Sequence, residues 1–196
     1  MSEFTDVPAG KIAAVVTYLE MRTRPRHDGQ EPALQDRIRR IEKPDPDWYL
    51  DVYNRIGADL LWFSRLVASR DKLVSTITDP NYEVCAVNYG DQDEGLVELD
   101  FRTPGACELA FFGVCPQLVG KGVGLALMQY AIQTAWAHPI ERFWVHTCTL
   151  DHPNALPFYL RCGFRAYKRE IEIADDPRLS GALPETAAPQ VPVIKP

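Results

Sequence analysis

Residues 116–136 read PQLVGKGVGLALMQYAIQTAW, three glycines spaced by single residues and followed by an apolar pattern of helical period. Gly120, Gly122 and Gly124 carry no Cβ, so their amides can approach a ligand closely and adopt φ values that other residues avoid. A helix that begins here directs its free N–H groups and the positive end of its dipole at the same point, where proteins bind phosphate. The stretch predicts an anion site at the start of an amphipathic helix.

Spacing separates the phosphate-binding motifs that could explain these glycines. A P-loop needs a glycine five positions before Gly120 and a hydroxyl residue after Lys121, but the chain has Cys115 and Gly122 there. The dinucleotide motif Gly-x-Gly-x-x-Gly takes Gly122 and Gly124 and then meets Leu127, which fits poorly. An unrelated nucleotide-binding protein, or a glycine-rich turn with no ligand, stays open on these residues alone.

The segments on either side of the glycines read as strands. Residues 107–114 are apolar, with Gly113 inside the run and Pro116 closing it, and a glycine in a strand indicates a bulge or a close backbone approach. Residues 142–149 are rich in β-branched and aromatic side chains. They lead into DHPNALPFYLRCGF at 151–164, where Asn154 and Tyr159 fall on a short helix that Gly163 would end.

Loop, strands and helix in this order resemble the GNAT superfamily of acetyl-CoA-dependent N-acetyltransferases. The family's pyrophosphate loop reads Gln or Arg, two residues, Gly, one residue, Gly or Ala; the chain matches it at Gly122 and Gly124 and has Val119 at the first position. Residues 151–164 are similar to the family's Asn-x-x-Ala-x-x-x-Tyr-x-x-x-Gly-Phe segment in a compressed form. The resemblance covers residues 11–173. It implies a mixed α/β fold with a mostly antiparallel sheet of six to seven strands flanked by helices.

The resemblance also implies roles for particular residues. Acetyl-CoA, as co-substrate, would be bound by the strand, the glycine loop and the helix start: Phe112, Gly113, Val114, Val119, Gly120, Lys121, Gly122, Val123, Gly124 and Asn154. Tyr159 would donate a proton or a hydrogen bond to the departing thiolate. Binding at the loop would rest on backbone amides, with Lys121 adding charge, because Val119 lacks a polar side chain.

Transfer to an amine also needs a base, since amines are mostly protonated at neutral pH. Glu108 lies on the strand that carries the family's usual glutamate, but a slip of one residue would reverse its side chain. His146 lies on the strand across the predicted cleft and has an ordinary pKa near neutrality. Glu98 and Asp100, on the neighbouring strand, are further candidates.

Length, composition and charge narrow the classes to which the protein can belong. The 196 residues are 46% hydrophobic, enough for one core, so we expect a single domain over 1–174 and an extended or mobile proline-rich tail over 175–196. A net charge of -6 argues against a nucleic-acid partner. The apolar runs are too short to span a membrane, and five cysteines without a C-x-x-C pair suggest neither a disulfide framework nor a metal site. These features predict a cytoplasmic protein.

The remaining pattern predicts the order of elements. Strands are expected at 11–21, 82–89, 96–102 and 165–173, with an acidic solvated turn at 90–95, and helices at 34–41, from Pro46 to Val67 and from Arg70 to Ile77. The predicted function is acetyl transfer to a small-molecule or peptide amine by direct attack. A non-catalytic acyl-CoA-binding module is the alternative, and a homodimer through an edge strand or the tail is compatible with the sequence.

Overall fold

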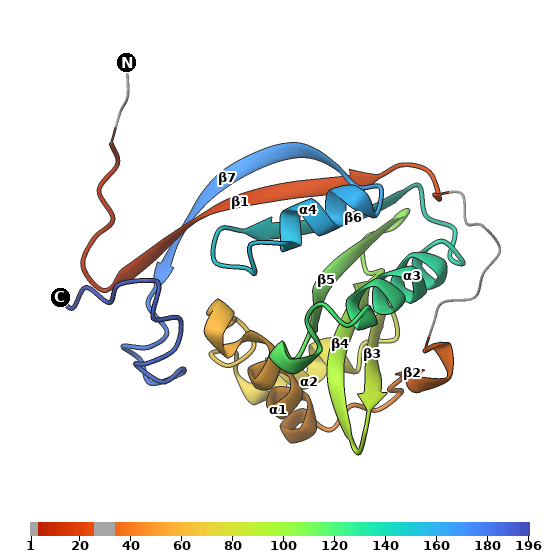
Figure 1. Ribbon diagram of the computed structural model, residues 1–196, viewed down its shortest axis with the longest axis horizontal. Helices are drawn as coiled ribbons and strands as arrows, with labels where there is room; N and C mark the ends of the chain where they lie inside the picture. Colours follow the sequence, from red (N-terminus) through yellow and green to blue (C-terminus); the bar gives the residue numbers. More distant parts are fainter. Residues whose placement is uncertain (1–3, 26–33) are drawn as a thin grey trace.

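A computed structural model describes residues 4–25 and 34–196 of the chain, and these form a single seven-stranded sheet (Figure 1). The strands are β1 (Lys11–Met21), β2 (Ile38–Arg40), β3 (Tyr82–Tyr89), β4 (Gln92–Asp100), β5 (Ala106–Val114), β6 (Arg142–Cys148) and β7 (Arg165–Asp175). Their order in the sheet is β2-β3-β4-β5-β6-β1-β7. Every neighbouring pair is antiparallel except β5 and β6, which run parallel. This confirms the predicted mixed, mostly antiparallel sheet.

Four helices cover the sheet: α1 (Pro46–Gly57), α2 (Arg70–Ile77), α3 (Val123–Ala135) and α4 (Ala155–Arg161). The Asp45 carboxylate accepts from the first amides of α1, and the Ser69 hydroxyl accepts from the amide of Lys72 in α2. Both caps confirm the helix starts that the sequence predicts. No helix within the described ranges has the length and apolar character needed to cross a membrane.

The helices divide between the two faces of the sheet. Leu96 and Val97 are consecutive in β4 and both fully buried, but Leu96 packs in the cluster of α1 and α2 whereas Val97 packs in the cluster of α3 and α4. Side chains alternate between faces along a strand, so the two clusters lie on opposite sides. The sheet is therefore sandwiched at β3–β5. Most of β7, at its edge, is exposed.

Two of the predicted helices are wrong, one in its type of structure and the other in its length. Over 34–41 the chain makes a single 3-10 turn and then β2, because buried Ile38 pairs with Val87 in β3 and extends the sheet. The helix from Pro46 ends at Gly57 instead of Val67. A Cβ on Gly57 would lie 2.4 Å from the ring of Trp62, so the glycine lets the chain turn back on itself. Apolar spacing alone did not reveal these tertiary contacts.

The turn between β3 and β4 is also tighter than predicted. β4 begins at Gln92, so only Gly90 and Asp91 connect the two strands. Asp93, expected to be solvated, is buried and accepts hydrogen bonds from Arg39 and from the indole N–H of Trp48 at 2.7 and 3.0 Å. Part of the acidic segment is structural.

The segment after β7 packs against the domain, in contrast to the extended or mobile tail expected from its prolines (Figure 1). The Arg178 guanidinium is almost fully buried; it pairs with Asp176 at 2.7 Å and donates to the carbonyl of Val191 at 2.8 Å. Leu183 joins an apolar cluster with Ile12 of β1. Proline excludes a regular helix here, but it does not prevent packing.

A fully buried carboxylate anchors α1 and β3 to β4. Glu98 accepts a hydrogen bond from the hydroxyl of Tyr49 at 2.5 Å and another from the hydroxyl of Tyr82. The Arg65 guanidinium pairs with the same carboxylate at 3.0 Å. A buried charge is tolerated only when paired and hydrogen-bonded. Glu98, weighed as a base from the sequence, therefore has a structural role.

Candidate functional site

The sheet opens where β5 and β6 separate (Figure 1). The two strands pair only from Ala106 with Arg142 to Glu108 with Trp144, and both continue beyond that point without pairing to each other. In β5, Leu109 pairs with Leu99 and Phe111 with Glu98, so Ala110 is an extra residue that forms a bulge. The divergence leaves a wedge between the strands with the backbone of β5 along one side.

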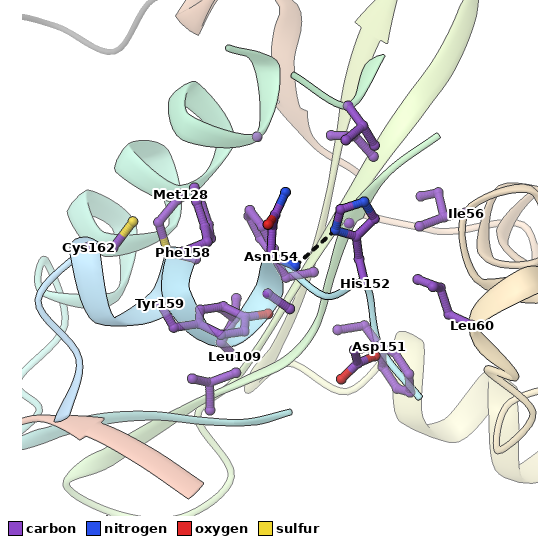
Figure 2. A pocket seen from close by; sticks show the side chains of 18 of the residues that line it. Ile56, Leu60, Leu109, Met128, Asp151, His152, Asn154, Phe158, Tyr159 and Cys162 are labelled. Carbon is purple, nitrogen blue, oxygen red and sulfur yellow. Dashed lines mark hydrogen bonds between the residues drawn. The ribbon is translucent and has the colours of Figure 1, made fainter. Parts of the chain in front are cut away.

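A cleft of about 1220 Å³ occupies this wedge. Most of its lining comes from four parts of the chain: β5 from Leu109 to Val114, the end of α1 with the segment up to Ser64, the glycine loop with α3, and the end of β6 with the connection into α4. Figure 2 shows side chains from the last part, including Asp151, His152, Asn154 and Tyr159, gathered around the same space. The topology brings together the two motifs that the sequence singled out.

The β5 wall contains three residues predicted to bind CoA: Phe112, Gly113 and Val114. Phe112 stacks on Phe158 of α4 at a centroid distance of 5.7 Å. A Cβ on Gly113 would lie 2.5 Å from Ile56 and 3.1 Å from the Trp62 ring. Of the two explanations for Gly113, close approach is confirmed, and the bulge lies at Ala110 instead.

The glycine loop has the conformation that an anion site needs. Gly120 and Gly122 adopt φ of 80° and 81°, and a Cβ at either position, or at Gly124, would meet no atom within 4 Å. Gly122 begins α3 without a side-chain cap. Among the residues that the structure describes, none accepts from the amides of Gly120, Gly122, Val123 or Gly124. These N–H groups are available to a ligand.

Not every residue of the predicted loop lines the cleft. Val119 does, and its side chain is exposed. The Val123 side chain is instead buried in the core under α3, and Lys121 lies outside the lining. Any contribution of Val123 therefore comes from its amide.

Tyr159 projects from α4 into the cleft, with its ring packed edge-on against Phe112, Phe158 and Phe164. Its hydroxyl points away from the helix toward the side where Asp151 lies (Figure 2). Burial raises the pKa of Tyr159 well above its ordinary value, and the charge of Asp151 raises it further. The hydroxyl thus stays protonated at neutral pH and can act as a donor.

Asn154 is the residue immediately before α4. Its amide donates to Nδ1 of His152 at 3.1 Å, and its side chain makes no capping bond to the helix. Both residues line the cleft and are exposed (Figure 2).

Glu108 and His146 form a pair, with 3.4 Å between the Glu108 carboxylate and Nδ1 of His146. Only His146 lines the cleft. The hydrogen bond to Glu108 and its negative charge raise the pKa of His146 above the ordinary value of 6.5, although partial burial opposes the shift. Asp100, the remaining candidate base, is bonded to Arg102 and does not line the cleft.

Sequence reasoning missed Asp151. One oxygen of the Asp151 carboxylate accepts from the Thr147 hydroxyl and the Cys148 amide at 2.7 and 2.8 Å, and the other accepts from the Trp62 indole at 3.2 Å. Asp151 follows the strand that leads into the Asn154 motif, a position that could have marked it. Its partner Trp62 lines the same cleft, and the turn after α1 sets the place of that ring.

The model of the acetyltransferase (GNAT) family matches residues 35–164, about two thirds of the chain. The protein belongs to the GNAT acetyltransferase family. A search of the curated proteins found no matching relative. The splayed strands β5 and β6, the glycine loop and Tyr159 all fall within the matched region, whereas β1 and β7 lie outside it.

Solved structures share the GNAT fold at low identity. A Staphylococcus epidermidis protein described as functionally unknown superposes with a TM-score of 0.57 and 17% identity over 85% of this chain and 63% of its own, so the present chain spans less than two thirds of it. An aminoglycoside acetyltransferase from an uncultured soil metagenomic sample, in complex with trehalose, superposes with a TM-score of 0.53 and 16% identity, over 66% of this chain and 90% of its own. The ribosomal-protein-S18-alanine N-acetyltransferase of Escherichia coli superposes with a TM-score of 0.56 and 15% identity, over 69% of this chain and 89% of its own.

Proposed function

We propose that this GNAT protein transfers an acetyl group from acetyl-CoA to the amine of a small molecule or peptide. One observation carries the proposal. A single cleft has free loop amides at the start of α3, an unpaired strand edge along β5 and a protonated phenol at Tyr159. These groups are suited to a pyrophosphate, a pantetheine arm and a leaving thiolate, respectively.

Acetyl-CoA supplies the activated thioester carbon, and the protein residues bind and orient it. The loop amides would hold the diphosphate, and the β5 amides beyond Glu108 would bond the pantetheine, because β6 no longer occupies that edge. Asn154, which lines the same cleft, would bond the same arm. Backbone groups dominate this set, which is why Val119 in place of a polar residue is compatible with binding.

We assign the proton transfers to two of the titratable groups that line the cleft, His146 and Tyr159. His146, oriented by Glu108, takes a proton from the acceptor ammonium. The neutral amine attacks the thioester carbon, the C–S bond breaks, and Tyr159 donates a proton to the thiolate. The nitrogen loses its second proton as the amide forms, and this proton restores the Tyr159 hydroxyl through water. His146 releases its proton to solvent, so an alkylammonium and acetyl-CoA give an amide, free CoA and one proton. Direct attack requires both substrates in the cleft at once.

Replacing Gly122 by Val tests the loop assignment. The side chain is expected to weaken acetyl-CoA binding about tenfold or more, because a β-branched residue strains the left-handed backbone and its atoms enter the space above the amides. Isothermal titration with acetyl-CoA measures the loss.

Gly90→Val is the matched control, since Gly90 has φ of 80° and equally open surroundings but lies in the β3–β4 turn. It should lower stability to a similar extent and leave acetyl-CoA affinity unchanged. Equal affinities for all three proteins would contradict the loop assignment. Binding by the wild type without thiol release from any amine would favour the non-catalytic module.

Glu108→Gln tests whether His146 is the base. A base must be neutral, so activity should rise with pH through the His146 pKa, which Glu108 holds above 6.5. Removing the carboxylate charge should move this acidic limb of kcat/KM to lower pH. If the acidic limb of kcat/KM lies at the same pH in the wild type and in Glu108→Gln, the Glu108–His146 pair takes no part in the proton transfer.

A further inference from the structure

The tail after β7 packs against the segment that follows α1 (Figure 1). Its buried apolar side chains share one cluster with Leu61 and with Ile12 of β1: Leu183, Ala187 and Ala188. The side-chain amide of Gln190 also donates to the carbonyl of Asp59 at 3.4 Å. The tail lies outside residues 35–164, so this packing is not part of the region that the family model matches.

Leu61 has a backbone conformation that leucine rarely adopts. Its φ of 54° and ψ of 39° are left-handed, and its side chain is buried in the cluster. A left-handed residue other than glycine costs free energy and persists where the surrounding packing fixes it. Within the described ranges three non-glycine residues have a positive φ, and a second of them, Ala188 with φ of 47°, lies in the same cluster. The cluster therefore fixes a turn on each side of the contact.

A buried ion pair fixes the tail's side of this contact. The Arg178 guanidinium pairs with Asp176 and donates to the carbonyls of Ala187, Ala188 and Val191 at 3.1, 3.4 and 2.8 Å. Charge-assisted bonds of this kind are among the stronger ones in proteins. The apolar side chains of the tail thus have fixed positions, although the segment contains no helix or strand.

The same cluster reaches the residues directly before a hydrogen-bonded pair in the cleft. Leu61 precedes Trp62, and Leu150, which packs against the cluster, precedes Asp151. The Trp62 indole donates to the Asp151 carboxylate at 3.2 Å, and both residues line the cleft. This bond joins the segment after α1 to the segment after β6. The charge of Asp151 raises the pKa of Tyr159, so the pair lies close to the proposed proton donor.

We propose that the tail is a positioning element of the cleft: its cluster, with Leu183 as the largest tail member, holds the indole of Trp62 on the carboxylate of Asp151. The inference rests on the proposed acetyl transfer and gives the tail a role in turnover without contact with the substrates. None of residues 176–196, all of which the structure describes, lines the cleft. A wall that is already in place when the substrates bind costs less ordering, and small displacements of such a wall slow the reaction.

Leu183→Ala tests this role, because it removes contacts from the cluster and leaves every residue of the cleft lining unchanged. The readout is the exchange of the Trp62 indole N–H with heavy water in proton–nitrogen correlation spectra, assigned by the signal that Trp62→Phe lacks. We expect exchange at least about tenfold faster than in the wild type. In the same protein kcat/KM for the amine should fall about tenfold, with acetyl-CoA affinity within about twofold of the wild type.

Two further variants separate this role from a general loss of stability. Leu73→Ala removes an equally buried side chain from α2, outside both the cluster and the cleft lining. At a comparable shift of the urea midpoint it should leave the Trp62 exchange and kcat/KM within about twofold of the wild type. Leu183→Met keeps the volume of the side chain and should behave like the wild type.

The outcomes separate this inference from the proposed function. Trp62 exchange within about twofold of the wild type in folded Leu183→Ala overturns the inference, and so does an equal acceleration in Leu73→Ala. If Leu183→Ala does not fold, Leu183→Val takes its place under the same criteria. Absence of thiol release by the wild type with every amine would instead refute the acetyl transfer, while the indole exchange would still report on the tail.

Discussion

Tyr159→Phe is expected to lower kcat by about 100-fold or more while changing acetyl-CoA affinity little. The ring stays, so its edge contacts with Phe112, Phe158 and Phe164 are kept, and only the hydroxyl is lost. The structure gives that hydroxyl no protein partner within the described residues. Its removal therefore acts on the transition state, where the thiolate needs a donor. Single-turnover thiol release measures the rate, and titration measures the affinity.

Tyr130→Phe is the matched control, because Tyr130 lies on α3 beside Cys85 and outside the cleft lining. It should retain the wild-type kcat. If Tyr159→Phe also keeps kcat within about a factor of two, Tyr159 is a packing residue and the mechanism needs another donor.

Glu98→Gln is expected to destabilise the protein by about 3–5 kcal/mol, the usual cost of breaking a buried ion pair by removing one partner. The amide keeps the volume of the side chain but leaves the Arg65 guanidinium without its counter-charge. It also puts an N–H where Tyr49 or Tyr82 now donates. The midpoint of urea unfolding, at unchanged slope, reports the loss.

Glu170→Gln is the surface comparison. Glu170 pairs with Lys168 at 2.6 Å, but both side chains are about half exposed, so the change should move the urea midpoint far less than Glu98→Gln does. A similar small effect at Glu98 would mean that the buried network contributes no more than a surface pair.

The sequence predicts the parts of this fold that depend on local chemistry. The glycines, the caps at Asp45 and Ser69 and the alternation in β3–β5 act over a few residues, so their spacing indicates the correct elements. The resemblance to GNAT proteins then placed Tyr159 and the loop in one cleft. Both line it in the structure.

The rest depends on contacts between distant residues. The end of α1 is set by Trp62 closing over Gly57, and the tail is held by Arg178, neither of which has a periodic signature. The choice between Glu108 and His146 depends on the pairing register of β5 and β6, which only the folded sheet fixes. Asp151 acquires its place from Trp62, 89 residues earlier in the chain.

Transfer of labelled acetyl from acetyl-CoA to a primary alkylamine is the most direct test of the proposed function. Wild-type protein is mixed with acetyl-CoA carrying a deuterated acetyl group and a panel of alkylamines, and free thiol and labelled amide are both quantified. The cleft chemistry predicts amine-dependent thiol release with an equal amount of labelled amide. Saturable acetyl-CoA binding with no labelled amide from any amine of the panel would contradict it.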